Sequence, residues 1–408
     1  MEHYIFYCKL SLLAVLSLIT ACCMLSRRWY VNLAAFLACL SGETFLAHLF
    51  FPGYMLCPAA ASFIILFLSR IWDLSRTSAK GNGADPIRLP VRSGIRESRL
   101  EFYYYYSNFL VYGGAGSGKT KSIGKWLLSE YMRLGFAGFI YDFKDTDYTR
   151  TAYNLIKRHR YPHKFYYVSF DRPERSYRFN PLKVVRDRTE LIQLMEDVLL
   201  ALLPKKEQQN EWVAGGLGIL RGVAFRFWDE FPEHCTLPHI LAFIMTASAR
   251  QHSLFLQQNL VSEMLAGAYL KAEGSEKTQA SYLSTLCNNL ATVSQNEEIA
   301  YVLSGDDFDF NLIDPENPKL FAVSNNFSKN SVYAPVISML MTISARQFSM
   351  QNRVPFVYFL DEMTTVNIKN FETLPSVLRE YKAAFILLTQ SGSKVENQYG
   401  LSLIHISE

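Results

Sequence analysis

The sharpest chemical signal in the chain is a glycine-rich segment at residues 113–120. It reads Gly-Gly-Ala-Gly-Ser-Gly-Lys-Thr and matches the pattern G-x-x-x-x-G-K-[ST] with no departure. Successive backbone N–H groups in such a turn can face phosphate groups, and a following helix N-terminus adds partial positive charge. We expect Lys119 to reach the β- and γ-phosphates of ATP and the Thr120 hydroxyl to ligate Mg²⁺. The predicted nucleotide-binding residues are Gly113, Gly114, Ala115, Gly116, Ser117, Gly118, Lys119, Thr120 and Lys121.

A second signal is an apolar run, 357–360, that ends in Asp361 and Glu362. An acidic pair at the end of a buried strand is the expected partner of a phosphate-binding loop. Asp361 would hold the Mg²⁺ shell, directly or through water, and Glu362 would polarise the attacking water as general base. We therefore predict Asp361 and Thr120 as metal ligands, and Lys119 and Glu362 as catalytic residues.

Three further features carry less specific signals. Gln390 ends the apolar run 383–389 and could sense the γ-phosphate through a hydrogen bond, or could simply face solvent. Arg379 lies between Glu362 and Gln390 and could offset transition-state charge in a neighbouring subunit, as an arginine finger does, or could be a solvated helix residue. The acids that follow the run 137–141, beginning with Asp142, could support the nucleotide or cap the next helix.

These residues need a parallel sheet to bring them together. The pattern predicts strands at 108–112, 137–141, 164–170, 319–325, 354–360 and 383–389. Helical patterns lie between them, the first over 119–134, and alternating strands and helices indicate an α/β fold with a parallel sheet. Residues 187–303 differ, because strand signals are scarce there. Apolar positions recur at spacings of 3 and 4, which predicts helices, over 191–203, 212–227, 239–247 and 282–293. We interpret them as an all-helical insert.

Composition points to a membrane-attached protein. The chain has 408 residues, of which 50% are hydrophobic and 19% charged, with a formal net charge of +4. A charged fraction of about 25% is usual for soluble domains, and this composition excludes a disordered chain. The apolar excess is concentrated in the runs 5–25, 29–51 and 54–68. The first two meet the length of about 20 residues that crosses a bilayer, and the third does so if it extends to Trp72.

The number of spans stays open between three and two, with three favoured. Three spans place Arg27, Arg28 and the basic segment 75–101 in the cytoplasm, in agreement with the positive-inside rule. Either version leaves the remainder cytoplasmic, and the basic segment could attract anionic membrane lipid. The predicted domains are a transmembrane anchor at 1–74, a basic linker at 75–101, a nucleotide-binding domain in two parts at 102–186 and 304–408, and the helical insert at 187–303.

The ordered set of motifs resembles the TraG/TraD-type coupling ATPases of conjugative and type IV secretion systems, in their Bacteroides mobilisation form. The supports are spread along residues 85–400. They are the loop 113–120, Asp142-Phe-Lys-Asp145, Phe179-Asn-Pro-Leu182, Thr285-Leu-Cys-Asn-Asn-Leu290, Ser304-Gly-Asp-Asp-Phe-Asp309, Leu360-Asp-Glu-Met363, Thr389-Gln-Ser391 and Tyr399-Gly400. The glycine-rich loop is shared with many NTPases, whereas the full ordered set is far more specific.

The resemblance implies a RecA-like P-loop ATPase of the bacterial inner membrane that uses ATP and Mg²⁺. It further implies a homo-hexameric ring that recruits a relaxase bound to DNA and passes single-stranded DNA to type IV secretion channel components. Arg379 and Gln390 match the family's arginine-finger and sensor positions. Two alternatives are a chromosome-segregation-type DNA pump and a membrane assembly subunit that binds ATP without turnover. The family's nucleotide domain normally continues beyond Gly400, so we expect the tail 401–408 to represent a truncated end.

Overall fold

The computed structural model describes residues 5–7, 9–15, 29–50, 64, 85–93, 96–114, 116–203, 208, 210–368 and 370–399. The chain consists of two compact units, Met1–Asp85 and Pro86–Glu408. The predicted site residue Ala115 and the end of the last family motif, Gly400, lie outside the described residues.

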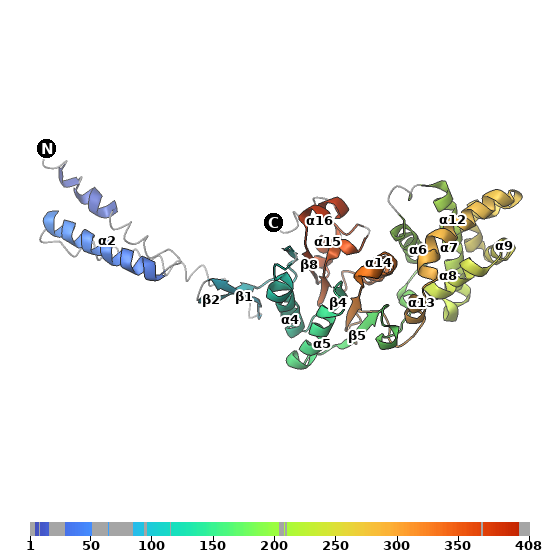
Figure 1. Cartoon of the computed structure of the whole chain (residues 1–408), viewed down its shortest axis with the longest axis horizontal. Coiled ribbons are helices and arrows are strands. Elements are labelled where there is room, and N and C mark those ends of the chain that lie inside the picture. The colour runs from blue at the N-terminus through green and yellow to red at the C-terminus, as the bar shows by residue number, and fades with distance from the viewer. Residues whose placement is uncertain are drawn as a thin grey trace. The chain divides into compact units, whose positions relative to one another are not determined.

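In the first unit, helix α2 (Trp29–Phe50) covers almost all of the second predicted membrane span (Figure 1). Most of the first and third predicted spans lies outside the described residues. Among the helices that are described, none is both long enough and apolar enough to cross a membrane. The transmembrane part of the predicted fold therefore has no support from this structure.

The second unit begins with an antiparallel hairpin of β1 (Ile87–Ser93) and β2 (Arg96–Phe102). This differs from the expectation of a linker over 75–101, because the strand pattern begins at residue 87. Ile87, Leu89 and Val91 occupy alternate positions of β1 and point to one face, where Ile87 is fully buried. On the other face, Arg88 pairs with Glu101 across the hairpin at 3.6 Å. The backbone N–H of Arg88 also donates to Glu130 at 2.8 Å, which ties the hairpin to the helix that carries Glu130.

A six-stranded, wholly parallel sheet forms the centre of the second unit, as predicted. In spatial order the strands are β3 (Phe109–Tyr112), β8 (Ala383–Thr389), β7 (Phe356–Leu360), β4 (Ala137–Asp142), β6 (Lys319–Ser324) and β5 (Lys164–Ser169). Four of these, β4, β6, β7 and β8, are buried along their whole length. Runs of apolar residues on both faces are expected where helices cover a parallel sheet on each side.

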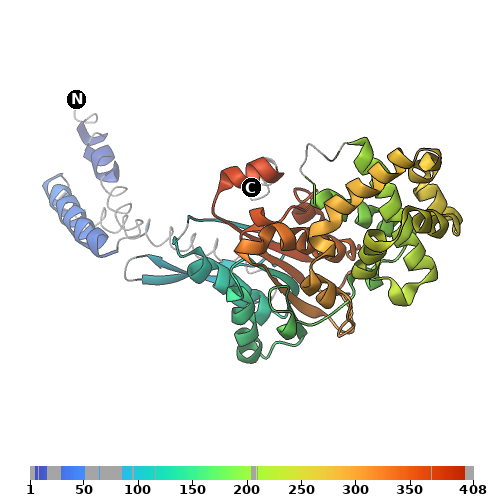
Figure 2. The same ribbon diagram turned by 45° about the vertical axis from the view of Figure 1, so that its right-hand side comes forward.

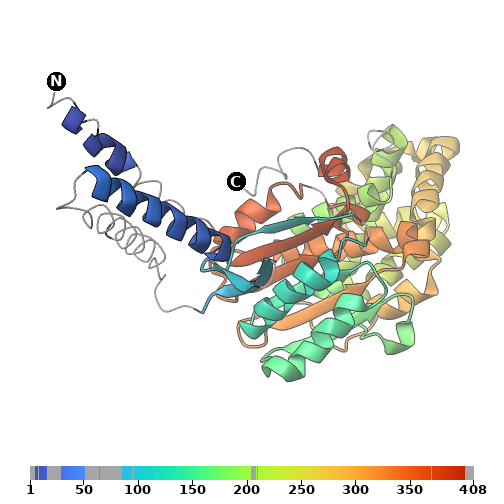
Figure 3. The ribbon, with the colours of Figure 1, turned by 60° about the vertical axis from the view of Figure 1, so that its left-hand side comes forward.

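The two faces of the sheet pack into separate cores. Helices α4 (Lys125–Arg133) and α5 (Asp147–His159) cover one face (Figure 3). Ile140, Phe359 and Ile386 belong to the core on this face. On the other, α14 (Asn330–Arg346) covers the alternate residues of the same strands, including Phe139 and Tyr358. The short helices α15 (Leu374–Glu380) and α16 (Gly392–Tyr399) flank β8 in sequence.

The segment between β5 and β6 forms a helical body at one end of the sheet (Figure 2). Several of its helices begin at a side chain that accepts the hydrogen bond of an N-terminal N–H group; the caps are Asp187, Asn210, Thr236, Ser248, Asn259 and Asn296. Its helices are α6 (Arg188–Ala201), α7 (Glu211–Glu230), α8 (Leu237–Thr246), α9 (Ala249–Gln257), α10 (Leu260–Leu265), α11 (Gly267–Lys271), α12 (Glu276–Ser294) and α13 (Glu297–Leu303).

Candidate nucleotide-binding site

The glycine-rich loop joins β3 to the helix that follows it. The N–H of Gly113 donates to the carbonyl of Thr389 at 3.2 Å, so the loop starts beside the end of β8. Gly116 (φ +75°) and Gly118 (φ +82°) occupy the left-handed region that glycine adopts without a steric penalty. Gly118, in turn, accepts at its carbonyl from the N–H of Ser122 at 2.8 Å, which begins the helical turns.

The first turn after the loop is wider than an α-helical turn. Residues Thr120–Gly124 form a π-helical turn before α4, where the sequence predicted one helix over 119–134. Single π-turns of this kind are frequent at functional sites. Thr120 is half-buried at the start of this turn, whereas Lys121 is exposed.

Lys119 contacts the predicted acidic pair at the end of β7. Its ammonium group donates to the Gly113 carbonyl at 3.1 Å and lies 3.5 Å from Oε2 of Glu362. Both side chains are only 6% exposed, so this ion pair is buried. Residues separated by 243 positions in the chain therefore meet at the carboxyl edge of the sheet, where open parallel sheets bind ligands.

Glu362 adopts a backbone conformation that is unusual for its residue type. Its φ of +50° and ψ of +55° place it in the left-handed region, which costs a non-glycine residue about 1 kcal/mol or more. In this conformation Oε1 of Glu362 accepts a hydrogen bond from the backbone N–H of Gln390 at 3.2 Å, and Oε2 faces Lys119. Such strain, held in place by two contacts, is typical of a functional position.

Asp361 is fully buried, and neither of its carboxylate oxygens has a hydrogen-bond partner among the described residues. Burial is the main cause that raises the pKa of Asp361 from 3.8 to about 7, while the positive charges of Lys144 and Lys119 oppose the rise. A buried acid without partners costs free energy unless another group satisfies it. Mg²⁺ prefers oxygen ligands and retains waters, so Asp361, together with Thr120, suits this ion.

Asp142, at the end of β4, holds the next helix in place. Its Oδ2 accepts from the backbone N–H of Thr149 at 2.8 Å and from the Thr149 hydroxyl at 2.9 Å. Burial raises the pKa of Asp142, and the bonds from Thr149 counteract that rise. Of the two interpretations left open for this acid, the structure supports the one that caps the following helix.

Tyr148, which the sequence analysis did not single out, also lies beside the site. Its side chain is fully buried, and burial followed by the charge of Asp361 raises the pKa of its hydroxyl. No hydrogen bond joins the Tyr148 hydroxyl to a partner among the described residues. A tyrosine near the start of a helix has no sequence signature, so only the fold could reveal it.

The structure does not bring all predicted residues together. Gln390 takes part through its backbone N–H, whereas its side chain is exposed rather than directed as a sensor within this chain. Arg379 is exposed on α15, and no recorded contact among the described residues joins it to Lys119, Asp361 or Glu362. A role for Arg379 in a neighbouring subunit remains a prediction.

Two of the family motifs meet where the chain enters and leaves the helical body. The backbone N–H of Arg178 donates to Asp307 at 2.7 Å, and the Phe308 ring lies 4.8 Å from that of Phe179. Asn180 donates to the carbonyl of Cys235 at 2.8 Å inside the helical body. These motifs therefore join the insert to the sheet domain.

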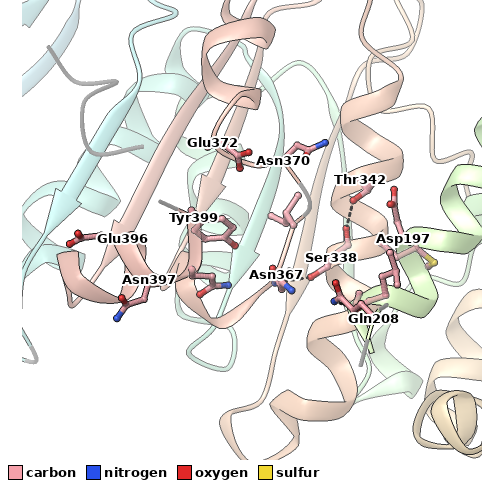
Figure 4. A pocket seen from close by; sticks show the side chains of 15 residues that line it. Asp197, Gln208, Ser338, Thr342, Asn367, Asn370, Glu372, Glu396, Asn397 and Tyr399 are labelled. Carbon is pink, nitrogen blue, oxygen red and sulfur yellow. Dashed lines mark hydrogen bonds between the residues drawn. The ribbon is translucent and has the colours of Figure 1, made fainter. Parts of the chain in front are cut away.

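Two neighbouring cavities share Asn367, Asn397 and Gln398 in their lining, and the larger of them reaches Glu362. One, of about 770 Å³, is lined by Glu362, Gln390, Phe143, Phe327 and Lys394 among others. The other, of about 460 Å³, lies among Asp197 of α6, Ser338 and Thr342 of α14, and Asn367 (Figure 4). The backbone N–H of Asn367 donates to Ser338 at 3.1 Å, which links the segment after Glu362 to α14.

The comparisons with known proteins agree with this geometry. The unbound monoclinic form of the bacterial conjugative coupling protein TrwBdeltaN70 is 16% identical, with a TM-score of 0.60, and the match covers 82% of this chain and 74% of that one. The plasmid coupling protein TrwB in complex with ADP and Mg²⁺ is also 16% identical, with a TM-score of 0.59 and coverages of 80% and 79%. These likenesses show that the chain shares the fold of these coupling-protein structures.

No curated protein matches the chain significantly. Residues 92–402, well over half of the chain, match the family model described as Type IV secretory system Conjugative DNA transfer. This match confirms the resemblance to TraG/TraD-type coupling proteins. The chain therefore belongs to the type IV secretory system conjugative DNA transfer family.

Proposed function

We propose that this chain is an ATPase that couples hydrolysis of ATP to the transfer of single-stranded DNA into a type IV secretion channel. The observation that carries the proposal is the buried contact between Lys119 and Glu362 at 3.5 Å, beside the unpartnered carboxylate of Asp361. A phosphate-binding lysine, a general base and a metal-binding acid are the parts that phosphoryl transfer to water requires. TrwB, in its complex with ADP and Mg²⁺, provides the precedent for the cofactors.

In this proposal each residue has one role. Lys119 and the N–H groups of residues 113–120 bind the phosphates, and Thr120 and Asp361 hold Mg²⁺, which would supply positive charge against the phosphate oxygens. The side chain of Glu362 must leave Lys119 when phosphate arrives, which frees Oε2 to accept a proton from water. The bond between Oε1 and the N–H of Gln390 would keep the carboxylate oriented during this change.

The partners follow from family membership and are proposed with it. They are a relaxase bound to single-stranded DNA, type IV secretion channel components and membrane lipid. We further propose a homo-hexamer in which Arg379 serves a neighbouring subunit. We place the protein at the bacterial inner membrane through segments within residues 1–74, with the ATPase domain in the cytoplasm. The apolar runs of the sequence support this location.

The proposal is tested by measuring ATP hydrolysis of the full chain with and without single-stranded DNA. We expect turnover that single-stranded DNA stimulates. Glu362→Gln should lower the turnover at least 100-fold while leaving ATP bound, because only proton removal from water is lost. Lys119→Ala should lose both binding and turnover. The matched controls are exposed residues of the helical body, Glu263→Gln and Lys271→Ala, which should behave as wild type.

The outcomes separate the alternatives. ATP binding without turnover in the wild type would favour an assembly subunit that does not hydrolyse ATP. Stimulation by double-stranded DNA alone would favour a DNA pump of the chromosome-segregation type. Turnover that survives Lys119→Ala would contradict the proposed site altogether.

A further inference from the structure

A chain of hydrogen bonds between three side chains ends at the backbone of Glu362. The Asn325 side-chain amide donates to the Tyr141 hydroxyl at 2.9 Å, and that hydroxyl lies 2.6 Å from the Thr365 hydroxyl. The Thr365 hydroxyl donates to the carbonyl oxygen of Glu362 at 2.8 Å. The three side chains lie at or just after the carboxyl ends of β6, β4 and β7, which are neighbours in the sheet. The chain of bonds therefore connects three strands that are distant in sequence.

The direction of each bond in this chain is fixed by its neighbours. The backbone N–H of Asn326 donates to Oδ1 of Asn325 at 2.7 Å, which leaves Nδ2 of Asn325 for Tyr141. The Glu362 carbonyl can only accept, so the single hydrogen of the Thr365 hydroxyl points at it. The Tyr141 hydroxyl must therefore donate to Thr365 while it accepts from Asn325. Without this hydroxyl, both of those groups would lose a partner.

Tyr141 also contacts the acidic pair through its backbone. Its carbonyl accepts from the N–H of Asp361 at 3.0 Å. The side chain is fully buried, and burial is the main cause that raises the pKa of the Tyr141 hydroxyl above its ordinary value of 10.0, so the hydroxyl stays protonated at neutral pH. Hydrogen bonds in such a buried place do not compete with water and hold their groups firmly.

The turn at Glu362 needs this support because its left-handed backbone is unfavourable. Such a conformation persists only where the surrounding contacts over-determine it. The Glu362 carbonyl accepts from both the backbone N–H and the hydroxyl of Thr365, at 2.9 and 2.8 Å. The carboxylate is held by Lys119 and by the N–H of Gln390. Because the contact with Lys119 is lost when phosphate arrives, the bonds through Thr365 must carry more of the restraint while ATP is bound.

We propose that Tyr141 is a positioning residue for the general base, and that its hydroxyl acts through Thr365 to keep Glu362 in its left-handed conformation. The inference rests on the proposed function, which gives Glu362 that role. Among the described residues, no hydrogen bond joins Tyr141 or Thr365 to the loop 113–120, so their loss should slow the chemical step and leave ATP binding unchanged. A displacement of a reacting group by about 1 Å can slow a reaction about 100-fold.

The test compares ATP hydrolysis and ATP binding of the full chain in wild type and Tyr141→Phe. The substitution removes one oxygen atom and keeps the ring in place. We expect kcat to fall roughly 10- to 100-fold, with the Kd for ATP unchanged within about twofold. Thr365→Val should lower kcat similarly, because it removes the hydroxyl and keeps the shape, whereas Thr365→Ser restores the hydroxyl and should retain kcat. The double variant Tyr141→Phe/Thr365→Val should be no slower than the slower single variant, because both changes break one chain.

Tyr358→Phe is the matched control. The Tyr358 hydroxyl is also buried on a central strand, in the same core as Tyr141, and lies 3.0 Å from the Ser344 hydroxyl of α14. Each substitution removes one buried hydroxyl from that core, so the two should lower stability to urea by similar amounts. Only Tyr141→Phe should lower kcat. Equal losses of kcat in the two variants would overturn the inference, because a general loss of packing would then explain both.

A second background identifies the residue through which Tyr141 acts. In Glu362→Gln, the residual turnover should not fall further when Tyr141→Phe is added, because the positioned base is already gone. A further fall by the same factor as in wild type would overturn the inference, and so would a Tyr141→Phe variant that keeps the wild-type kcat or loses only ATP affinity. In each of these cases wild-type turnover would leave the proposed function intact. Absence of turnover in the wild type would instead refute the proposed function, and the inference with it.

Discussion

Replacing Asp361 with Asn should change how the stability of the nucleotide-free protein depends on pH. Asp361 is fully buried without a partner, and its pKa is about 7 in the folded chain against an ordinary value of 3.8. Because the folded pKa is raised, the folded state binds this proton more tightly than the unfolded state does. The stability that this carboxyl contributes is fully present below about pH 4 and is lost as pH rises through 7.

The magnitude follows from the two pKa values. At 1.36 kcal/mol per pH unit, the change from 3.8 to about 7 corresponds to about 4 kcal/mol once the pH exceeds both values. The interval from pH 5 to pH 8 contains about 2–3 kcal/mol of this total. Asn carries no titrating proton, so the free energy of unfolding of Asp361→Asn minus that of wild type should increase by this amount from pH 5 to pH 8.

The assay is urea denaturation of the full chain in EDTA at several pH values, with the exposed substitution Glu316→Gln as control. The control should shift stability equally at every pH. Adding ADP with Mg²⁺ should stabilise wild type more than Asp361→Asn, because only the carboxylate can serve the metal. A difference between Asp361→Asn and wild type that stays constant from pH 5 to pH 8 would refute the view that Asp361 is buried and uncompensated.

Three further substitutions test separate contacts by urea denaturation. Lys119→Ala leaves Glu362 buried without its cation and should lower the free energy of unfolding by up to about 3 kcal/mol. The double variant Lys119→Ala/Glu362→Gln should recover part of this loss, and equal stability of the single and double variants would contradict the ion pair. Gly124→Ala should lower the free energy of unfolding by about 1–3 kcal/mol in wild type but by less in a Tyr148→Phe background, which lacks the hydroxyl oxygen that the added Cβ would meet. If the effects of the two substitutions simply add, that clash does not exist. Gly305→Ala should lower the free energy of unfolding by about 1–3 kcal/mol, because its Cβ would lie 2.9 Å from the carbonyl carbon of Arg178. The control Gly274→Ala places its Cβ in open space and should leave stability unchanged.

The strands were predictable because each is an apolar run that ends in polar residues. The strand predicted at 383–389 is observed with the same bounds, and that predicted at 354–360 begins two residues later. Their spatial order was not predictable from the sequence. β8 is the last strand that the structure describes, yet it lies between β3 and β7, because the order depends on which faces the connecting helices cover. This order is what places Gln390 beside Glu362.

The helical insert shows where local patterns succeed and where they fail. The helix predicted at 212–227 is observed as α7 despite four glycines, because these positions serve packing. A Cβ on Gly218 would come within 2.8 Å of the Leu265 carbonyl oxygen, and one on Gly222 within 2.9 Å of that of Ser262. The shorter helices α9, α10, α11 and α13 were not predicted, since fewer than three turns leave too little periodicity to recognise.

The sequence identified the site residues by type but not their conformations. The left-handed backbone of Glu362 and the π-turn at Thr120 are imposed by contacts from distant parts of the chain. The close approach of Tyr148 to Gly124 depends on the same kind of contact. Local propensity cannot report such features, which is why the parts of the site that depart from local rules became visible only in the fold.

Helix α14 contacts both the segment after Glu362 and the first helix of the insert. The Ser338 hydroxyl of α14 accepts a hydrogen bond from the backbone N–H of Asn367, five residues after Glu362. Eight residues further along, Arg346 pairs with Asp197 of α6 at 2.5 Å and accepts at its carbonyl from Arg186 at 2.7 Å. Eight residues of α-helix span about 12 Å and move as one rigid element. We infer that a shift of the segment after Glu362, when Lys119 exchanges that carboxylate for phosphate, would reach the first helix of the insert through α14. The insert enters the chain between β5 and β6, yet α14 connects it to the segment that follows β7.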